Sequence, residues 1–159
     1  MRKQKGFSLI ELLIVVAIIL IIAAIAIPNL LRSRIAANEA SAVGSVRTIN
    51  TSEVTYASTY PQIGFAPLAN LGGAGGSAAG AGLLDSVLSA GTKSGYVFTT
   101  PAAGITPSSC GTTVACSTYT VTGDPQNSQT GQRHFFSDQS GVIRYNTSAA
   151  ASAGDPPLQ

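Results

Sequence analysis

The sequence feature that most constrains this chain is an uninterrupted apolar segment near its N-terminus. Every residue from Leu12 to Ile27 is apolar, and the wider window from Phe7 adds only Ser8 and Glu11 as polar side chains. These 21 residues are enough to cross a hydrocarbon core about 30 Å thick, because an α-helix rises about 1.5 Å per residue. The segment therefore predicts a single membrane-spanning helix.

Much of the basic charge of the chain lies in front of this segment. Arg2, Lys3 and Lys5 precede it, and without them six basic side chains face seven acidic ones. A basic cluster at one end of a span stays on the cytoplasmic side, so the rest of the chain is expected to face outward. No basic stripe or run remains elsewhere, which argues against nucleic-acid binding.

An ordinary secretory signal peptide is the competing interpretation of this segment. Ala24-Ile25-Ala26 fits a small-x-small cleavage site, after which a secreted soluble binding protein or enzyme would begin at Ile27. The apolar run of 16 residues is longer than a signal core of about 7–15 residues. Glu11 also interrupts the window, and a carboxylate at the bilayer centre costs about 2.5–3.5 kcal/mol. Such a carboxylate calls for a partner or a function.

The residues Gly6-Phe7-Ser8-Leu9-Ile10-Glu11, followed by an apolar helix, resemble the N-terminal motif of the type IV prepilins. The short leader is similar to that of the type IVa pilins and the type II secretion pseudopilins. The resemblance implies that prepilin peptidase removes residues 1–6, cutting between Gly6 and Phe7, and methylates Phe7. It also implies that Glu11 of an incoming subunit pairs with the Phe7 amine of its neighbour. An amine of this kind is mostly positive at neutral pH. A pair within one chain is the alternative.

The helix is expected to continue beyond the membrane segment, which comprises residues 7–28. Pro28 should kink or loosen it, or simply end the membrane segment. Apolar residues then recur three and four positions apart over residues 29–60, which predicts an amphipathic half of the same helix. The apolar stripe consists of Leu31, Ile35, Ala42, Val46, Ile49, Tyr56 and Tyr60, with Glu53 among them. Pro61 is a natural stop, so the whole helix would be about 80 Å long.

The remaining residues predict a small α+β head. Residues 61–95 are expected to form a flexible Gly/Ala-rich loop and a short helix, Leu83–Ala90, ended by Gly91. Residues 96–147 hold short β-branched and aromatic runs that predict an antiparallel sheet of three or four strands. These runs are Tyr96–Thr100, Ser117–Thr122, Arg133–Ser137 and Val142–Asn146. Residues 148–159 are expected to be a loose surface tail. The layout resembles the pilin fold, with the sheet packed on the long helix.

Few residues of the head are candidates for chemistry. Cys110 and Cys116 form an isolated close pair, which in an exported chain indicates a disulfide, and a zinc site is the weaker alternative because no second ligand pair accompanies them. His134 and Asp138 invite a hydrolase interpretation, but no nucleophile elbow is present. Asp138 and Ser140 could donate oxygens to calcium, as the resemblance to pseudopilins suggests, although turn formation explains them better. Neither an enzyme activity nor a cofactor is expected.

The leading functional hypothesis is a structural one. The resemblance implies a type IV pilin that waits in the inner membrane as a single-pass protein with a cytoplasmic N-terminus. It would then join many copies of itself in an extracellular pilus. The implied partners are prepilin peptidase, an inner-membrane assembly platform with its ATPase, and an outer-membrane secretin. The alternative is a major pseudopilin of a type II secretion system. The cysteine pair and the lack of an acidic calcium loop favour the pilin.

Overall fold

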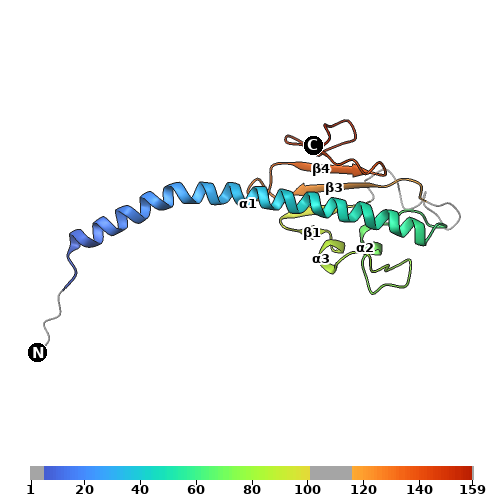
Figure 1. The fold of residues 1–159 in the computed structure, drawn as a ribbon, viewed down its shortest axis with the longest axis horizontal. Coiled ribbons are helices and arrows are strands. Elements are labelled where there is room, and N and C mark those ends of the chain that lie inside the picture. The colour runs from blue at the N-terminus through green and yellow to red at the C-terminus, as the bar shows by residue number, and fades with distance from the viewer. Residues whose placement is uncertain (1–5, 101–115, 159) are drawn as a thin grey trace, which may run out of the picture. The chain divides into compact units, whose positions relative to one another are not determined.

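The structure is a computed structural model that describes residues 6–100 and 116–158. The chain divides into two units, residues 1–34 and residues 35–159, and each is described by itself. Helix α1 (Leu9–Thr59) contributes its first part to the first unit and its second part to the second unit, which we call the head. Figure 1 shows the first part of α1 in blue and the head with its labelled strands.

The described part of the first unit, residues 6–34, consists mainly of the largely apolar first part of α1. The helix begins at Leu9 and passes through Pro28, which therefore lies inside α1 rather than at its end. Within the described part of the chain, α1 is the one helix that is long and apolar enough to cross a membrane. Beyond the proline, the hydroxyl of Ser33 donates to the carbonyl of Asn29 at 3.0 Å, so this polar side chain is satisfied by its own helix.

The second part of α1 buries one face against the rest of the head, as the periodicity of its apolar residues predicts. The buried side chains of α1 are Glu39, Ala42, Ser45, Val46, Ile49, Ser52, Glu53 and Tyr56. Four of the seven apolar residues of the predicted stripe lie on this buried face. Leu31 belongs to the first unit and stays 40% exposed. The helix ends at Thr59, two residues before Pro61, whose missing N–H group and ring oppose continuation.

The head contains an antiparallel sheet of five strands in consecutive order. The strands are β1 (Thr92–Lys93), β2 (Tyr96–Thr99), β3 (Thr120–Pro125), β4 (His134–Asp138) and β5 (Arg144–Asn146). The sequence predicts three or four strands, and the additional one is the two-residue β1. It pairs with β2 through a turn at Ser94 and Gly95, whose φ angles of 52° and 74° are both positive. Two residues with positive φ form the type I′ turn that suits the twist of a hairpin.

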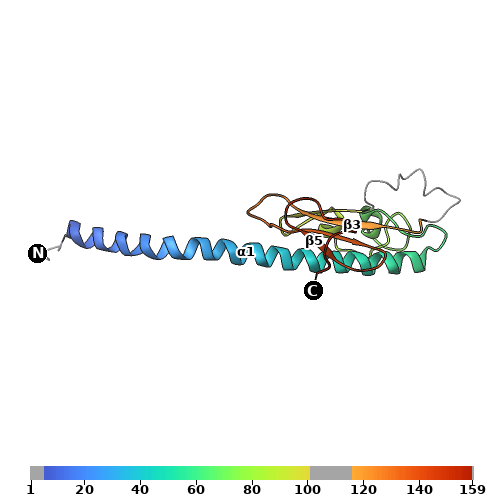
Figure 2. The ribbon, with the colours of Figure 1, turned by 90° about the horizontal axis from the view of Figure 1, so that it is seen from above.

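The core of the head lies between the sheet and α1. Figures 1 and 2 show the strands lying along the second part of the helix. Val46 and Ile49 of α1 belong to one buried cluster with Phe98 of β2, Val121 of β3 and Phe135 of β4. The packing is close enough that a Cβ atom at Gly123 would lie 3.1 Å from the Phe98 ring. A glycine in β3 therefore makes room for an aromatic ring of the neighbouring strand.

The Gly/Ala-rich segment is more ordered than its composition predicts. It follows an additional short helix, α2 (Leu68–Leu71). Backbone hydrogen bonds connect residues within the segment. The N–H of Gly75 donates to Gly80 at 3.1 Å, and the N–H of Gly82 donates to Gly72 at 2.9 Å. The Tyr56 hydroxyl donates to the Ala78 carbonyl at 2.7 Å. Hydrogen bonds thus join the two ends of the expected flexible loop to each other and join the loop to α1.

The short helix that follows is present but shorter than predicted. Helix α3 (Ser86–Ser89) begins after Asp85, whose side chain accepts hydrogen bonds from the N–H groups of Val87 and Leu88. Gly91, with a φ of 82°, follows it. Asp85 is an N-cap residue, which explains why the helix begins there and not at Leu83.

The C-terminal tail differs from the expected loose segment. The N–H of Leu158 donates to the carbonyl of Ile143 at 2.7 Å, and the N–H of Tyr145 donates to Pro156 at 3.2 Å. Asp155 accepts hydrogen bonds from Ser152 at 2.6 Å (N–H) and 2.9 Å (hydroxyl) and from the Asn146 amide at 2.9 Å. One carboxylate thereby folds the tail back on β5.

Candidate functional site

The start of α1 is the first candidate site. Gly6, Phe7 and Ser8 precede the helix, and the Phe7 side chain is 83% exposed. The carboxylate of Glu11 accepts a hydrogen bond from the N–H of Ser8 at 2.9 Å. Serine followed three residues later by glutamate is the capping-box pattern, in which the glutamate satisfies a free N–H group at the helix start. The sequence contains this signal, but the interpretation of Glu11 as an assembly residue overlooked it.

Gly6 has no structural reason to be a glycine in this chain. A Cβ atom at this position would meet no heavy atom within 4 Å, and the φ angle is not in the left-handed region. A residue type that the fold does not require is explained more easily by recognition. The cleavage between Gly6 and Phe7 remains a prediction.

The apolar half of α1 is an exposed surface. The large apolar side chains from Phe7, which directly precedes α1, to Leu31 are between 40% and 83% exposed. Monomeric soluble proteins rarely expose a contiguous apolar patch larger than a few hundred Å². Lipid or other protein must therefore cover this surface.

Glu53 is a buried carboxylate in the core of the head. It has no exposed surface, one oxygen accepts a hydrogen bond from the N–H of Ala66 at 3.1 Å, and the other has no hydrogen-bond partner among the described residues. Burial raises the pKa of Glu53 to about 7, and the hydrogen bond from Ala66 opposes this shift only in part. The sequence placed Glu53 on the buried stripe without assigning it a partner.

Glu39 is a second buried carboxylate of α1, and it is fully engaged. It accepts hydrogen bonds from the N–H groups of Gln132 at 2.9 Å and Arg133 at 3.2 Å, and from the Arg133 guanidinium at 2.7 Å. The Arg133 guanidinium also lies 5.7 Å from the ring centroids of Phe135 and Tyr145. Glu39 therefore fastens the segment before β4 to the helix.

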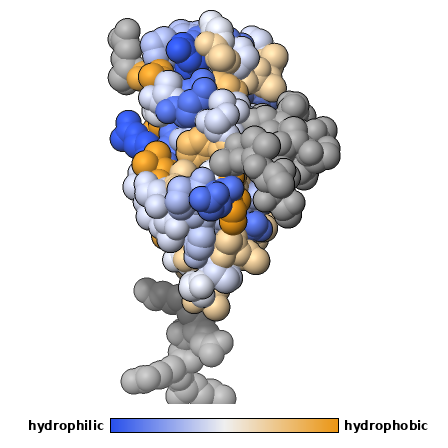
Figure 3. Space-filling view, turned by 90° about the vertical axis from the view of Figure 1, so that its right-hand side faces the viewer, coloured by the Kyte–Doolittle hydropathy of each residue, from blue (hydrophilic) through white to orange (hydrophobic). Residues whose placement is uncertain are grey.

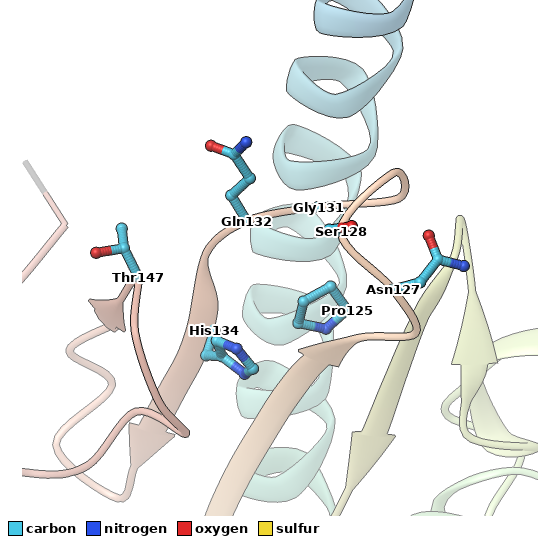
Figure 4. A pocket seen from close by; sticks show the side chains of 7 residues that line it. All are labelled: Pro125, Asn127, Ser128, Gly131, Gln132, His134 and Thr147. Carbon is cyan, nitrogen blue, oxygen red and sulfur yellow. The ribbon is translucent and has the colours of Figure 1, made fainter.

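A shallow pocket of about 360 Å³ lies beside the connection between β3 and β4 (Figure 4). Its lining comprises Pro125, Asn127, Ser128, Gly131, Gln132, His134 and Thr147. His134 does not meet Asp138. Its Nδ1 atom instead lies 2.6 Å from Oδ1 of Asp124, because the antiparallel register places these residues opposite one another on β3 and β4. Spacing along the sequence does not predict this pair, because the pair depends on the register of β3 and β4.

The remaining predicted site residues have simpler surroundings. The carboxylate of Asp138 accepts a hydrogen bond from the N–H of Ser140 at 2.8 Å, which is the geometry of a turn. The described residues contain no cluster of three or more histidine, cysteine, aspartate or glutamate side chains that could hold a metal. Cys110 lies outside the described residues, so its disulfide with Cys116 remains a prediction.

By its length and composition, the exposed apolar helix fits an N-terminal membrane anchor for the small head. Residues 1–27 match the prokaryotic N-terminal methylation motif. Together with the curated relatives below, this match shows that the N-terminal part of the chain is similar to that of type IV pilins.

Two curated relatives show this similarity. The chain is 67% identical over 39 residues to the type IV wide pilus major component PilA4 of Thermus thermophilus, an alignment that covers 24% of this chain and 30% of that protein. It is 39% identical over 72 residues to the type IV major pilin protein PilA of Myxococcus xanthus, which covers 41% of this chain and 33% of that protein. The alignments thus span about a third of each relative. No solved structure matches the chain.

Proposed function

We propose that this protein is a structural subunit of a type IV pilus, which assembles from many copies through the apolar half of α1. The observation that carries the proposal is the exposed apolar surface from Phe7 to Leu31. This surface suits lipid before assembly and the apolar helices of other subunits afterwards. The two relatives are described as major components of type IV pili, which supports the same function.

Processing at Gly6 and Phe7 prepares the helix for assembly. Prepilin peptidase would remove residues 1–6 and with them Arg2, Lys3 and Lys5, the cytoplasmic basic cluster. The exposure of Phe7 and the open space around Gly6 are what such an enzyme needs to reach the peptide bond. Methylated Phe7 would then be the first residue of the mature subunit.

Glu11 gives the assembly its electrostatic register. An isolated carboxylate is costly in an apolar bundle, and the Phe7 amine is the nearest cation that processing creates. The pairing of Glu11 with the Phe7 amine of a neighbouring subunit would neutralise both groups and fix the stagger between copies. In the uncleaved chain the Ser8 N–H already occupies one Glu11 oxygen at 2.9 Å.

The similarity to type IV pilins implies further partners, which would assemble the filament. The subunit would wait in the inner membrane with a cytoplasmic N-terminus. An assembly platform and its ATPase would extract it, and an outer-membrane secretin would admit the filament to the exterior.

Mass spectrometry of filaments sheared from native cells tests this function. We expect abundant protein that begins with methylated Phe7 in the filament fraction. Protein that begins at Phe7 but occurs only in the cell envelope would indicate a pseudopilin of type II secretion instead. A soluble chain that begins at Ile27 would overturn the filament proposal.

A further inference from the structure

Two arginines directly follow the apolar surface of α1. Arg32 and Arg34 are exposed, and they lie in the first unit of the chain. The ion pairs among the described residues are Lys93–Asp85, Arg133–Glu39 and His134–Asp124. Neither Arg32 nor Arg34 takes part in one, so both guanidinium groups are available to an anion outside the described chain.

The position of the arginines along α1 matches the thickness of a bilayer. From Leu9 to Leu31 the helix rises about 33 Å, and the hydrocarbon core of a bilayer is about 30 Å thick. The next turn of the helix, which carries Arg32 and Arg34, therefore falls at the level of the lipid headgroups. Arginine side chains at such a level extend towards phosphate.

The directions of the two side chains distinguish lipid from a protein partner. Successive residues of an α-helix are separated by about 100°, so Arg32 and Arg34 leave α1 on nearly opposite sides. A single flat protein surface would meet only one of them. A headgroup layer surrounds the helix and meets both.

We propose that Arg32 and Arg34 bind the phosphate groups of outer-leaflet phospholipids and hold the unassembled subunit at a fixed depth. Guanidinium groups bind phosphate through paired hydrogen bonds, which makes arginine well suited to this contact. The inference rests on the proposed function, because it requires α1 to span the membrane. It adds a consequence for assembly. Removal of the leader takes away Arg2, Lys3 and Lys5 on the cytoplasmic side of the membrane. Arg32 and Arg34 then remain as the cationic contact, on the outer side, towards which the subunit is extracted.

A single tryptophan can report the depth of the helix, because the chain has no tryptophan of its own. Leu30→Trp places an indole on a side chain that is 70% exposed in the structure. The full chain is reconstituted in vesicles of phosphatidylethanolamine and phosphatidylglycerol, with lipids brominated at defined depths as quenchers. We expect that the added double substitution Arg32→Gln and Arg34→Gln moves the indole deeper by about one helical turn, ~5 Å.

The controls separate phosphate binding from other effects of the substitutions. Arg47→Gln neutralises another exposed arginine of α1, in the head, and should leave the depth unchanged. In vesicles of digalactosyldiacylglycerol, a bilayer lipid without phosphate, the chain with both arginines and the double variant should show the same depth.

Three results would count against the proposal in distinct ways. Equal depths in phospholipid vesicles would overturn the proposal while α1 remains a membrane span. Depths that differ equally with and without lipid phosphate would overturn phosphate as the partner. An indole that no brominated lipid quenches would show that α1 is not in the membrane, and the proposed function would fail as well.

Discussion

Glu53 shows what a single buried carboxylate does to the head. Within the described part of the chain, its hydrogen bond comes from the N–H of Ala66, and its neighbours Tyr56 and Tyr119 offer no positive charge. Burial raises the pKa of Tyr119 to about 12, and the nearby Glu53 charge adds to this shift. The head therefore accommodates Glu53 as a neutral acid better than as an anion.

The first prediction concerns the pH dependence of stability. The pKa of Glu53 rises from 4.5 to about 7 on folding, so the folded head binds this proton more tightly than the unfolded chain. The protonation of Glu53 therefore contributes about 3 kcal/mol to the free energy of unfolding. This contribution is complete below pH 4.5 and is lost as the pH rises to about 7. Glu53→Gln should remove this loss, so that the free energy of unfolding varies less between pH 4.5 and 8. Urea denaturation of the full chain in detergent at several pH values measures the effect. If the free energy of unfolding of Glu53→Gln varies with pH as strongly as that of the original chain, the prediction is wrong.

Glu39 provides a matched contrast, because it is the other buried carboxylate of α1. Its three hydrogen bonds include one from the Arg133 guanidinium. Glu39→Gln should lower the free energy of unfolding at pH 7 by about 2 kcal/mol, since a hydrogen bond to a charged group is lost and the cation is left unpaired. The same denaturation experiment serves for both variants. A Glu39→Gln chain as stable as the original would show that the contact contributes little.

At the scale of elements, the glycine-rich segment depends on close approach of backbone to backbone. A Cβ atom at Gly82 would lie 2.9 Å from Cα of Gly75, whereas one at Gly76 would meet nothing within 4 Å. Both positions have positive φ, 68° and 86°, so alanine is conformationally unfavourable at each. The two glycines therefore form a pair in which only the steric contact differs.

Gly82→Ala should destabilise the head by about 1–3 kcal/mol more than Gly76→Ala, the typical cost of overpacking. Thermal unfolding of the two variants, followed by tyrosine circular dichroism, gives the comparison. Equal losses would mean that the segment can move apart without cost, as the composition alone had suggested.

The sequence predicts the elements whose signals are local and periodic. The 3.6-residue period predicts α1 and its buried face, and runs of β-branched and aromatic residues predict β2, β3, β4 and β5 within a few positions. The two-residue β1 and the four-residue α2 are too short for a period to reveal. The Ser94-Gly95 dipeptide is a turn signal from which the hairpin of β1 and β2 could have been predicted.

Contacts between distant residues could not be predicted in this way. The pair of Asp124 and His134 depends on the register of β3 and β4, and the order of the tail depends on Asp155 reaching Asn146. Composition predicts a loose tail because alanine, serine and glycine lack large apolar side chains. It does not show that one carboxylate can satisfy several donors of the folded tail.

At the scale of the whole molecule, one part of the chain suits an apolar environment and the other part suits water. The first part of α1 exposes large apolar side chains, whereas the head encloses five aromatic residues in one buried cluster: Tyr56, Tyr96, Phe98, Tyr119 and Phe135. On the face of the head in Figure 3, hydrophilic and hydrophobic residues are interspersed. A chain of this kind needs an apolar environment for one part and water for the other, which both a bilayer and a filament with a helical centre provide.

The last prediction separates the two roles that Glu11 can have. As a helix cap, Glu11 accepts a hydrogen bond from Ser8, and glutamine can do the same. As an assembly residue, it needs its charge to neutralise the Phe7 amine of a neighbour. Glu11→Gln keeps the cap and removes the charge, whereas Glu11→Ala removes both.

Both variants should enter the membrane and begin at Phe7 after processing, and both should be absent from sheared filaments. An unpaired charge inside an apolar bundle costs about 3–5 kcal/mol, so incorporation should fall by about 100-fold or more. Mass spectrometry of filaments from cells that also express the unaltered chain measures this ratio, because the unaltered copies supply the filament. If Glu11→Gln enters filaments normally and Glu11→Ala does not, Glu11 serves only to start the helix. The stagger between subunits must then come from the packing of apolar side chains along α1.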